Sequence, residues 1–291
     1  MRFLSFLKEN VLYIIWFMIN LALGWLVLGA NLTALWLVCV IYAFSIGIAL
    51  CPVGEWLLRL IEGCRQVSTR REQEYLHPIF EEVYENAKQV KPELNNNIKL
   101  YIVDEMYVNA YAIGRKTIAV TQGAIETFSQ EELKGIIAHE FGHMAYGHTK
   151  ALLLTTIGNM LFTCIVVFLR IIMMIIQVLT CAFSGGNGII STILNIMFRT
   201  SFELSLFVFV NLGEIILAMN SRKNEYKADE FALEAGFGEE LKESLYILQK
   251  ISMQGKMSLS ERIKASHPHT AKRIEHLEQL SEGALSLEMQ Y

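Results

Sequence analysis

The sequence predicts a mainly α-helical multi-pass membrane protein with four transmembrane helices and an α+β domain that contains a small β-sheet. Hydrophobic residues make up 53% of the 291 residues and charged residues only 19%, and the mean hydropathy is +0.35. Four long apolar runs, grouped as two hairpins, alternate with polar segments that have the periodicity of helices and strands. We therefore divide the chain into a cytoplasmic N-terminus with a first transmembrane hairpin (1–52), a first part of the polar domain (53–150), a second transmembrane hairpin (151–220) and a second part of the polar domain (221–291).

The first hairpin consists of two uncharged runs, Val11 to Gly29 and Leu32 to Pro52, and a turn at Ala30-Asn31 joins them. Each run is close to the roughly 20 residues that cross a bilayer core. The first run is too long for the apolar part of a signal peptide and ends in a poor cleavage site, so we expect it to remain as an anchor.

The second hairpin is predicted from Ala151 to Phe183 and from Gly188 to Asn220, with a glycine-rich turn between the two runs. The rise of a helix places Arg170 and Glu203 near the far interface, where they either pair or extend separately to the headgroups. The residues between them, 171–200, form either an external or a re-entrant hairpin, and the sequence leaves both open.

Basic residues indicate the orientation, because they flank the apolar runs on one side only and the two turns carry none. By the positive-inside rule, both termini and the polar domain face the cytoplasm, which predicts a multi-pass protein of the cell (inner) membrane. The five cysteines lack disulfide or metal-type spacing. With a net charge of −4 and a pI near 6.0, we expect the lipid bilayer and no nucleic acid among the partners. The flanking basic residues are Arg2, Lys8, Arg59, Arg65, Arg70, Arg71, Arg222 and Lys223.

The polar domain is predicted to contain a small sheet with helices before and after it in the sequence. Glu72 to Val90 has an apolar helical face, and Pro78 is expected to be tolerated only in the first turn of a helix. Asn97 to Asp104 and Lys116 to Thr121 are rich in strand-forming residues and surround a third extended run that ends at Ala112. Two further helices are predicted near the C-terminus, from Glu239 to Ser252 and from His269 to Ser281.

The run His139-Glu140-Phe141-Gly142-His143 lies in a predicted helix, where residues four apart share a face. His139 and His143 can therefore each offer a ring nitrogen to one Zn²⁺ at about 2.0–2.1 Å. Glu140 lies beside the open ligand position, where its carboxylate can accept a proton from a water molecule that the metal activates. This motif also occurs in ordinary amphipathic helices. A third candidate ligand is therefore needed to distinguish a zinc site from an ordinary amphipathic helix.

Glu225 is the best candidate for that third ligand, and Asp229 follows it by one helical turn. Glu225 would complete a His₂Glu site, and Asp229 could accept the N–H of a zinc-ligating imidazole and so fix its tautomer. The alternative is a solvated helix start with acidic residues near its positive end. A third histidine six residues beyond His143 is excluded, because that position is Thr149.

These motifs resemble those of the HtpX-type membrane zinc metalloproteases, which are relatives of the CAAX prenyl proteases. The resemblance rests on Asn109-Ala110-Tyr111-Ala112-Ile113-Gly114, His139 to His143, Ser221-Arg222 with Glu225 to Asp229, and Ser266-His267-Pro268 with Arg273-Ile274. It implies a gluzincin-like zinc protease domain with one Zn²⁺ per chain, held by His139, His143 and Glu225, with Glu140 as the general base. It also implies polypeptide substrates, bound at an edge strand through Asn109 and Ala110. Tyr111 stands where the family usually has Phe, which leaves the backbone role intact.

Hydrolysis of a peptide bond places negative charge on the carbonyl oxygen, and a donor beside the metal would stabilise it. His267 is the candidate donor, with a surface helix cap as the alternative. Arg273 is expected to orient either the substrate or the carboxylates near the metal. The biological role that the resemblance implies is quality control of misfolded or damaged membrane proteins, and we expect it at the cytoplasmic face. The alternatives are maturation of one specific peptide or prenylated substrate, and a non-catalytic zinc-stabilised membrane scaffold.

Overall fold

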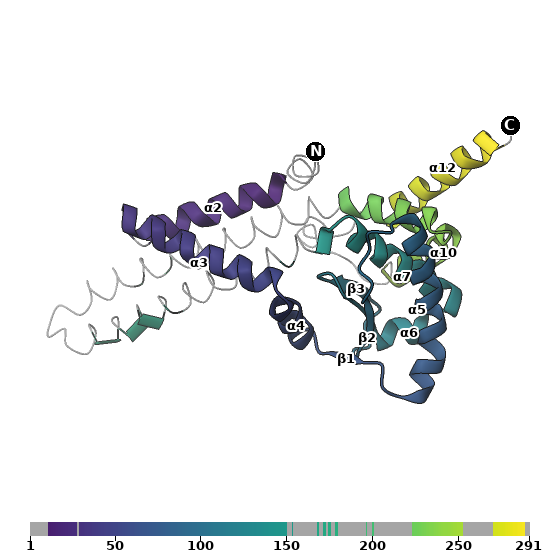
Figure 1. Ribbon diagram of the computed structural model, residues 1–291, viewed down its shortest axis with the longest axis horizontal. Coiled ribbons are helices and arrows are strands. Elements are labelled where there is room, and N and C mark those ends of the chain that lie inside the picture. The colour runs from purple at the N-terminus through teal and green to yellow at the C-terminus, as the bar shows by residue number, and fades with distance from the viewer. Residues whose placement is uncertain are drawn as a thin grey trace. The chain divides into compact units, whose positions relative to one another are not determined.

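The computed structural model describes residues 11–27, 29–149, 223–252 and 270–288, together with isolated positions between Leu153 and Thr200 (Figure 1). Most of the predicted second hairpin lies outside the described residues, as does His267. The chain forms two compact units, one of residues Met1–Gly47 and Thr155–Leu217 and the other of residues Ile48–Leu154 and Ala218–Tyr291.

Two apolar helices, α2 (Val11–Val27) and most of α3 (Leu32–Leu50), make up most of the described part of the first unit. Gly29 and Ala30 take positive φ angles in the turn between them, and the Asn31 side chain accepts a hydrogen bond from the N–H of Ala34 at 2.7 Å. The two helices pack through the edge-to-face rings of Phe17 and Tyr42. Among the described residues, α3 is the one helix both long and apolar enough to cross a bilayer, because α2 has 17 residues.

The second unit contains a four-stranded sheet with the order β1-β2-β4-β3. Strands β2 (Lys99–Val103) and β4 (Thr117–Thr121) are parallel, whereas β1 (Cys64–Gln66) and β3 (Ala110–Ile113) pair antiparallel with β2 and β4, respectively. Strands β2 and β4 fall within the predicted extended runs, and β3 overlaps the third run but ends one residue beyond it, at Ile113. Strand β1 was not predicted, because three residues are too short to show an alternating pattern.

Helix α4 (Pro52–Ile61) connects the first hairpin to the sheet and was not predicted either. It begins two residues after α3 ends, with Pro52 in its first turn, where the missing N–H breaks no intrahelical hydrogen bond.

Helix α5 (Arg70–Val90) begins two residues before the predicted start, since Thr69 and Glu72 form a capping box there. The expectation that Pro78 would be confined to the first turn of a helix was wrong, because α5 continues through it. Pro78 is exposed, so the carbonyl that it leaves without an N–H partner faces water rather than the core. The buried face of α5 consists of the predicted residues Leu76, Ile79, Phe80, Val83 and Ala87.

Arg65 of β1 ties the start of α5 to the sheet. Its guanidinium donates to the Glu72 carboxylate at 2.7 Å and to Asp104 at 2.8 Å. The hydrogen bond from Arg65 outweighs partial burial and lowers the pKa of Glu72 to about 2. The ionised form of Glu72 is therefore favoured in the folded protein.

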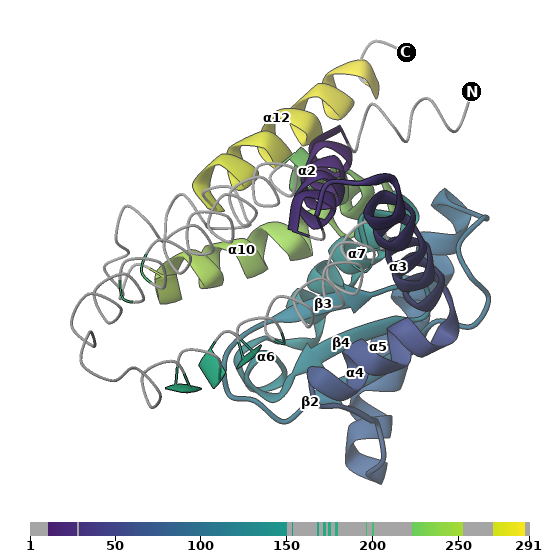
Figure 2. The same ribbon diagram turned by 90° about the vertical axis from the view of Figure 1, so that its left-hand side faces the viewer.

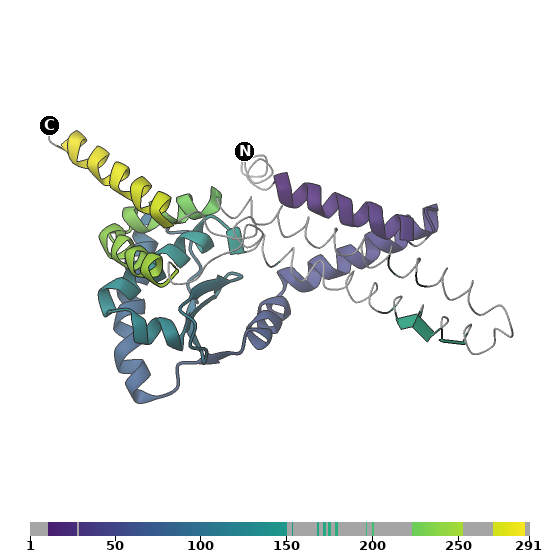
Figure 3. The ribbon, with the colours of Figure 1, turned by 180° about the vertical axis from the view of Figure 1, so that it is seen from behind.

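Helix α7 (Gln130–Ala145) occupies the centre of the second unit (Figure 2). It packs on β3 and β4 on one side and on α5 and α10 (Gly238–Ser252) on the other. Gly135 permits the approach of α10, because a Cβ atom there would lie 2.2 Å from the backbone nitrogen of Leu241. Viewed from behind, α12 (Thr270–Glu288) packs on α10 and runs away from it toward the C-terminus (Figure 3). It extends seven residues beyond the predicted Ser281.

Candidate active site

Helix α7 presents the His139-Glu140-Phe141-Gly142-His143 motif to the interior of the second unit. A capping box of Ser129 and Glu132 fixes the start of the helix, and Phe141 is fully buried in the core below the motif. His139 and Glu140 are 5% and 7% exposed. Phe141 packs on the rings of Phe80 and Tyr84 of α5, so the rotation of the helix about its axis is set by its apolar residues.

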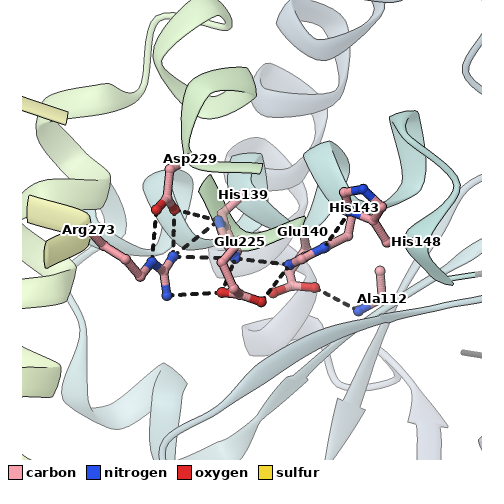
Figure 4. Close-up of polar contacts among 8 residues, drawn as sticks. All are labelled: Ala112, His139, Glu140, His143, His148, Glu225, Asp229 and Arg273. Carbon is pink, nitrogen blue, oxygen red and sulfur yellow. Dashed lines mark hydrogen bonds and ion pairs between the residues drawn. The ribbon is translucent and has the colours of Figure 1, made fainter. Parts of the chain in front are cut away.

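The third candidate ligand is brought to α7 by a helix whose described part covers residues 223–234, here called the third-ligand helix. Gly142 permits this approach, because a Cβ atom at that position would lie only 2.8 Å from the Cα of Ala228. Glu225 lies one turn before Ala228 and is 1% exposed. The close backbone contact therefore places the Glu225 carboxylate opposite the two histidines (Figure 4).

His139, His143 and Glu225 form a group that can hold one metal ion. The Nε2 atoms of the two histidines lie 3.2 Å apart. Oxygens of the Glu225 carboxylate lie 3.4 Å from Nε2 of His139 and 3.3 Å from Nε2 of His143. The predicted ligand set is thus assembled from two helices that are distant in sequence.

Asp229 lies behind His139, at the place that the sequence predicted. Its Oδ1 atom is 2.9 Å from Nδ1 of His139, so an N–H at Nδ1 can donate to Asp229 and leave Nε2 free for a metal. Burial and the charge of Arg273 act to lower the pKa of His139, but the contacts with Asp229 and Glu225 outweigh them and raise it to about 9. The same carboxylates that favour a proton here favour a divalent cation in its place.

Arg273 of α12 is buried against these carboxylates. Its guanidinium donates to both oxygens of Asp229, at 2.8 and 2.6 Å, and lies 3.2 Å from an oxygen of Glu225. This charge outweighs burial and lowers the pKa of Asp229. Arg273 thus contacts the carboxylates of Asp229 and Glu225 directly.

Glu140 contacts the edge of the sheet. The backbone N–H of Ala112 in β3 donates to its Oε2 atom at 2.8 Å. Sequence reasoning missed this contact, since the participating group is a backbone amide and every residue except proline has one. The general-base candidate and the edge strand are therefore directly linked.

Strand β3 lies at the end of the sheet order, so one of its edges faces away from β4. The N–H and C=O of Asn109 both bond to Thr121, on the β4 side. Because backbone direction alternates along a strand, the groups of Ala110 and Ala112 point to the opposite edge. Asn109 thus offers an exposed side chain to a ligand at this edge, whereas Ala110 offers its backbone groups.

His148 lies beside His143, with their Nδ1 atoms 3.0 Å apart. Burial, reinforced by nearby positive charge at His143 and Lys227, lowers the pKa of His148 to about 3. A neutral His148 can accept the Nδ1 proton of His143, which leaves Nε2 of His143 directed at the metal position.

Comparisons with known proteins agree with this geometry. Residues 70–281 match the model of peptidase family M48. Protease HtpX of Pseudomonas putida (strain GB-1) is 29% identical over 244 residues, which cover 79% of this chain and 77% of that protein. Protease HtpX of Pseudomonas fluorescens (strain Pf-5) is 30% identical over 244 residues, with the same coverage.

Among solved structures, S. mikatae Ste24p matches with 19% sequence identity and a TM-score of 0.49. The match covers 94% of this chain and 64% of that protein's chain.

The family match covers most of the chain and contains both the motif on α7 and the third-ligand helix. The matches to the two HtpX proteases cover 77% of the length of each relative. The chain therefore belongs to peptidase family M48, as a membrane metalloprotease of the HtpX type.

Proposed function

We propose that the protein is a zinc-dependent endopeptidase that hydrolyses peptide bonds of misfolded or damaged membrane proteins at the cytoplasmic face of the cell (inner) membrane. The observation that carries the proposal is that His139, His143 and Glu225 each offer one ligand atom within 4.8 Å of the other two. The Nε2 atoms of the two histidines lie 3.2 Å apart, and each lies 3.3–3.4 Å from a different oxygen of the Glu225 carboxylate. Four ligands arranged tetrahedrally at about 2.0–2.1 Å from Zn²⁺ lie about 3.3–3.4 Å apart. The two histidine nitrogens thus fit two corners of a zinc tetrahedron, and the Glu225 carboxylate lies within reach of a third.

The charge of the site supports the same ion. Glu140, Glu225 and Asp229 face only one buried arginine, Arg273, among the described groups that contact them, so the site has an excess of negative charge. Such an excess compensates a divalent cation. A structural zinc site has four protein ligands, whereas three ligands and a neighbouring carboxylate leave one position open for chemistry.

When bound, zinc supplies a Lewis acid that lowers the pKa of a coordinated water toward about 7 and polarises the scissile carbonyl. The residues of the chain supply the rest. Glu140 accepts the proton of the attacking water at its carboxylate, and the N–H of Ala112 holds one of its oxygens in place. Asp229 accepts the Nδ1 proton of His139, which directs Nε2 toward the metal, and Arg273 holds the Asp229 carboxylate in place.

The substrate is proposed to bind as an extended strand beside β3. Backbone groups of Ala110 on the free edge would pair with the substrate backbone, and the Asn109 side chain would contact it from the end of the strand. His267 is proposed to donate to the developing oxyanion. A substrate bound through its backbone is recognised with little dependence on its side chains, which suits the degradation of many proteins.

The experiment that tests the proposal is the substitution Glu140→Gln in the full-length protein. The amide cannot accept a proton, whereas the ligands remain, so we expect full zinc content and cleavage of casein reduced at least about 10²-fold. Proteomics of membranes that contain either form separates the roles: many accumulating proteins indicate quality control, and a single one indicates a maturation protease for one peptide or prenylated substrate. Undiminished cleavage by the Glu140→Gln protein would refute the assignment of the base.

A further inference from the structure

Helix α4 has an apolar face that no described part of the protein covers. The large side chains of Val53 and Trp56 are each 54% exposed, and those of Leu60 and Ile61 are 62% and 61% exposed. Val53, Trp56 and Leu60 are spaced three and four residues apart, so they form one stripe along the helix. The opposite face carries the buried residues Gly54, Glu55 and Leu58. The usual arrangement of a soluble amphipathic helix, with its polar residues outside, is thus inverted.

The position of α4 in the chain identifies what covers this stripe. Cys51 alone separates Pro52 from the end of α3, the described helix that can cross a bilayer. A helix that begins at the end of a transmembrane span starts at the level of the lipid headgroups. Tryptophan is enriched at this level, because its ring combines an apolar body with a polar N–H. The chemistry and the location both fit the interfacial layer of a membrane.

The buried face of α4 holds the turn between β3 and β4. The Glu55 carboxylate accepts hydrogen bonds from the backbone N–H groups of Arg115 and Lys116, at 3.1 and 3.2 Å, and from the hydroxyl of Thr117 at 2.7 Å. Arg59 of the same helix donates to the Thr117 hydroxyl at 2.9 Å. The end of the edge strand is therefore fixed to α4 by charge-assisted hydrogen bonds.

The approach is close enough to require a glycine in the turn. Gly114 has a φ angle of +60°, and a Cβ atom there would lie 2.6 Å from an oxygen of Glu55. Ala112, two residues earlier, donates its N–H to Glu140. A continuous path of hydrogen bonds and a single short strand thus connects the apolar stripe of α4 to the catalytic carboxylate.

We propose that α4 lies in the membrane interface with Val53, Trp56 and Leu60 among the lipid acyl chains, and that Glu55 on its other face is a positioning residue for the edge strand. The lipid bilayer then fixes the strand that binds the substrate, and the proteolytic site is held at a set depth below the membrane surface. The membrane placement of α4 rests on α3 as a transmembrane helix and does not depend on zinc or on proteolysis, whereas its consequence for the substrate and the proteolytic site rests on the proposed function.

The depth of Trp56 can be measured in the full-length protein reconstituted in phosphatidylcholine vesicles. A variant with Trp16, Trp25 and Trp36 replaced by Phe keeps Trp56 alone. We expect its fluorescence to be quenched strongly by lipids brominated near the headgroup, weakly by lipids brominated near the chain end, and little by aqueous acrylamide. If the triple variant does not fold, the difference between the wild type and Trp56→Phe gives the same quantity.

Two results would overturn the membrane part of the proposal. Quenching by acrylamide but not by brominated lipids would place the stripe in water. Protection from both quenchers would show that protein covers it, either the second hairpin or a second copy of the chain. A variant that keeps Trp36 alone, which is 70% exposed on α3, is the matched control for lipid contact.

The positioning role is tested by hydrogen exchange of the amides at residues 110–117 in vesicles. Glu55→Gln keeps the shape but removes the charge, and we expect at least about tenfold faster exchange of the Arg115 and Lys116 amides. Trp56→Glu should accelerate the same amides by withdrawing α4 from the lipid, whereas Trp56→Phe should not. Unchanged exchange in Glu55→Gln would refute the positioning role, and unchanged exchange in Trp56→Glu would refute its connection to the membrane.

Discussion

Substituting Gly142 by alanine should impair metal binding through a steric contact rather than through loss of a ligand. Gly142 stands between the two histidines of the motif, at the point where α7 meets the third-ligand helix. An added Cβ atom would lie 2.8 Å from the Cα of Ala228, and 3.0 Å from both its carbonyl oxygen and the Cβ of Phe231. Two of these atoms are backbone, and the third is fixed in the core, so a side-chain rotation cannot relieve the contact.

The size of the effect follows from these distances. Carbon atoms pack best at about 3.5–4.0 Å, so the third-ligand helix must move away by about 0.7 Å. Zinc–ligand distances tolerate about ±0.2 Å. Glu225 moves with its helix, and we expect zinc affinity to fall by about 10–100-fold, as it does when the support of a ligand is removed. Overpacking should also lower the free energy of unfolding by about 1–3 kcal/mol.

The assay is a zinc titration of the purified Gly142→Ala protein against a chelator, with thermal unfolding measured on the metal-free form. Gly135→Ala is the matched control, because its Cβ atom would strike α10, which carries no ligand. The control should lose stability but keep its zinc affinity. If Gly135→Ala does not fold, Leu241→Ala disturbs the same α7–α10 contact by leaving a cavity. Normal zinc affinity in Gly142→Ala, or an equal loss in the control, would refute the reasoning.

Three further predictions concern side chains around the site and at the start of α5. Asp229→Ala should weaken zinc binding by about 10–100-fold, because His139 loses its hydrogen-bond acceptor, and isothermal titration would show no change if Asp229 has no such role. His148→Ala should lower zinc affinity to a similar extent, because His143 loses the acceptor of its Nδ1 proton. His148→Gln should restore part of the affinity, since an amide oxygen can accept that proton. Equal zinc affinities in the two variants would contradict this role of His148. Glu72→Gln should lower the melting temperature near neutral pH. The pKa of Glu72 in the folded protein is below its unfolded value of 4.5, so its charge stabilises the fold at neutral pH. The difference in melting temperature between wild type and variant should therefore shrink as the pH falls from about 5 to about 2. A difference that persists at pH 2 would show that charge is not the cause.

The elements that the sequence predicted well are those whose residues carry their own periodic signal. The buried face of α5 has apolar residues at helical spacing over about three turns, from Leu76 to Ala87, and these side chains pack into the core. The motif on α7 and the pair Glu225 and Asp229 were recognisable because metal ligands and their partners must come from few residue types at fixed helical spacing. The structure confirms that these residues lie together, although they are far apart in the chain.

The features that the sequence did not predict depend on tertiary contacts. Strand β1 exists because Arg65 and its neighbours pair with β2, and its three residues have no pattern of their own. Pro78 is accommodated in α5 because it lies outside the buried face of the helix and faces solvent. The contact between Ala112 and Glu140 involves a backbone amide, and α4 shows an apolar pattern whose orientation depends on what surrounds it.

The order of the ligands along the chain has a consequence for synthesis. His139 and His143 precede the predicted second hairpin, whereas Glu225 and Asp229 follow it. A growing chain that has completed α7 therefore carries only two of the three candidate ligands, together with the candidate base. The candidate metal site can assemble only after the later apolar segments have been made and the third-ligand helix has docked at Gly142. The order of the segments along the chain thus delays metal binding until these later segments exist.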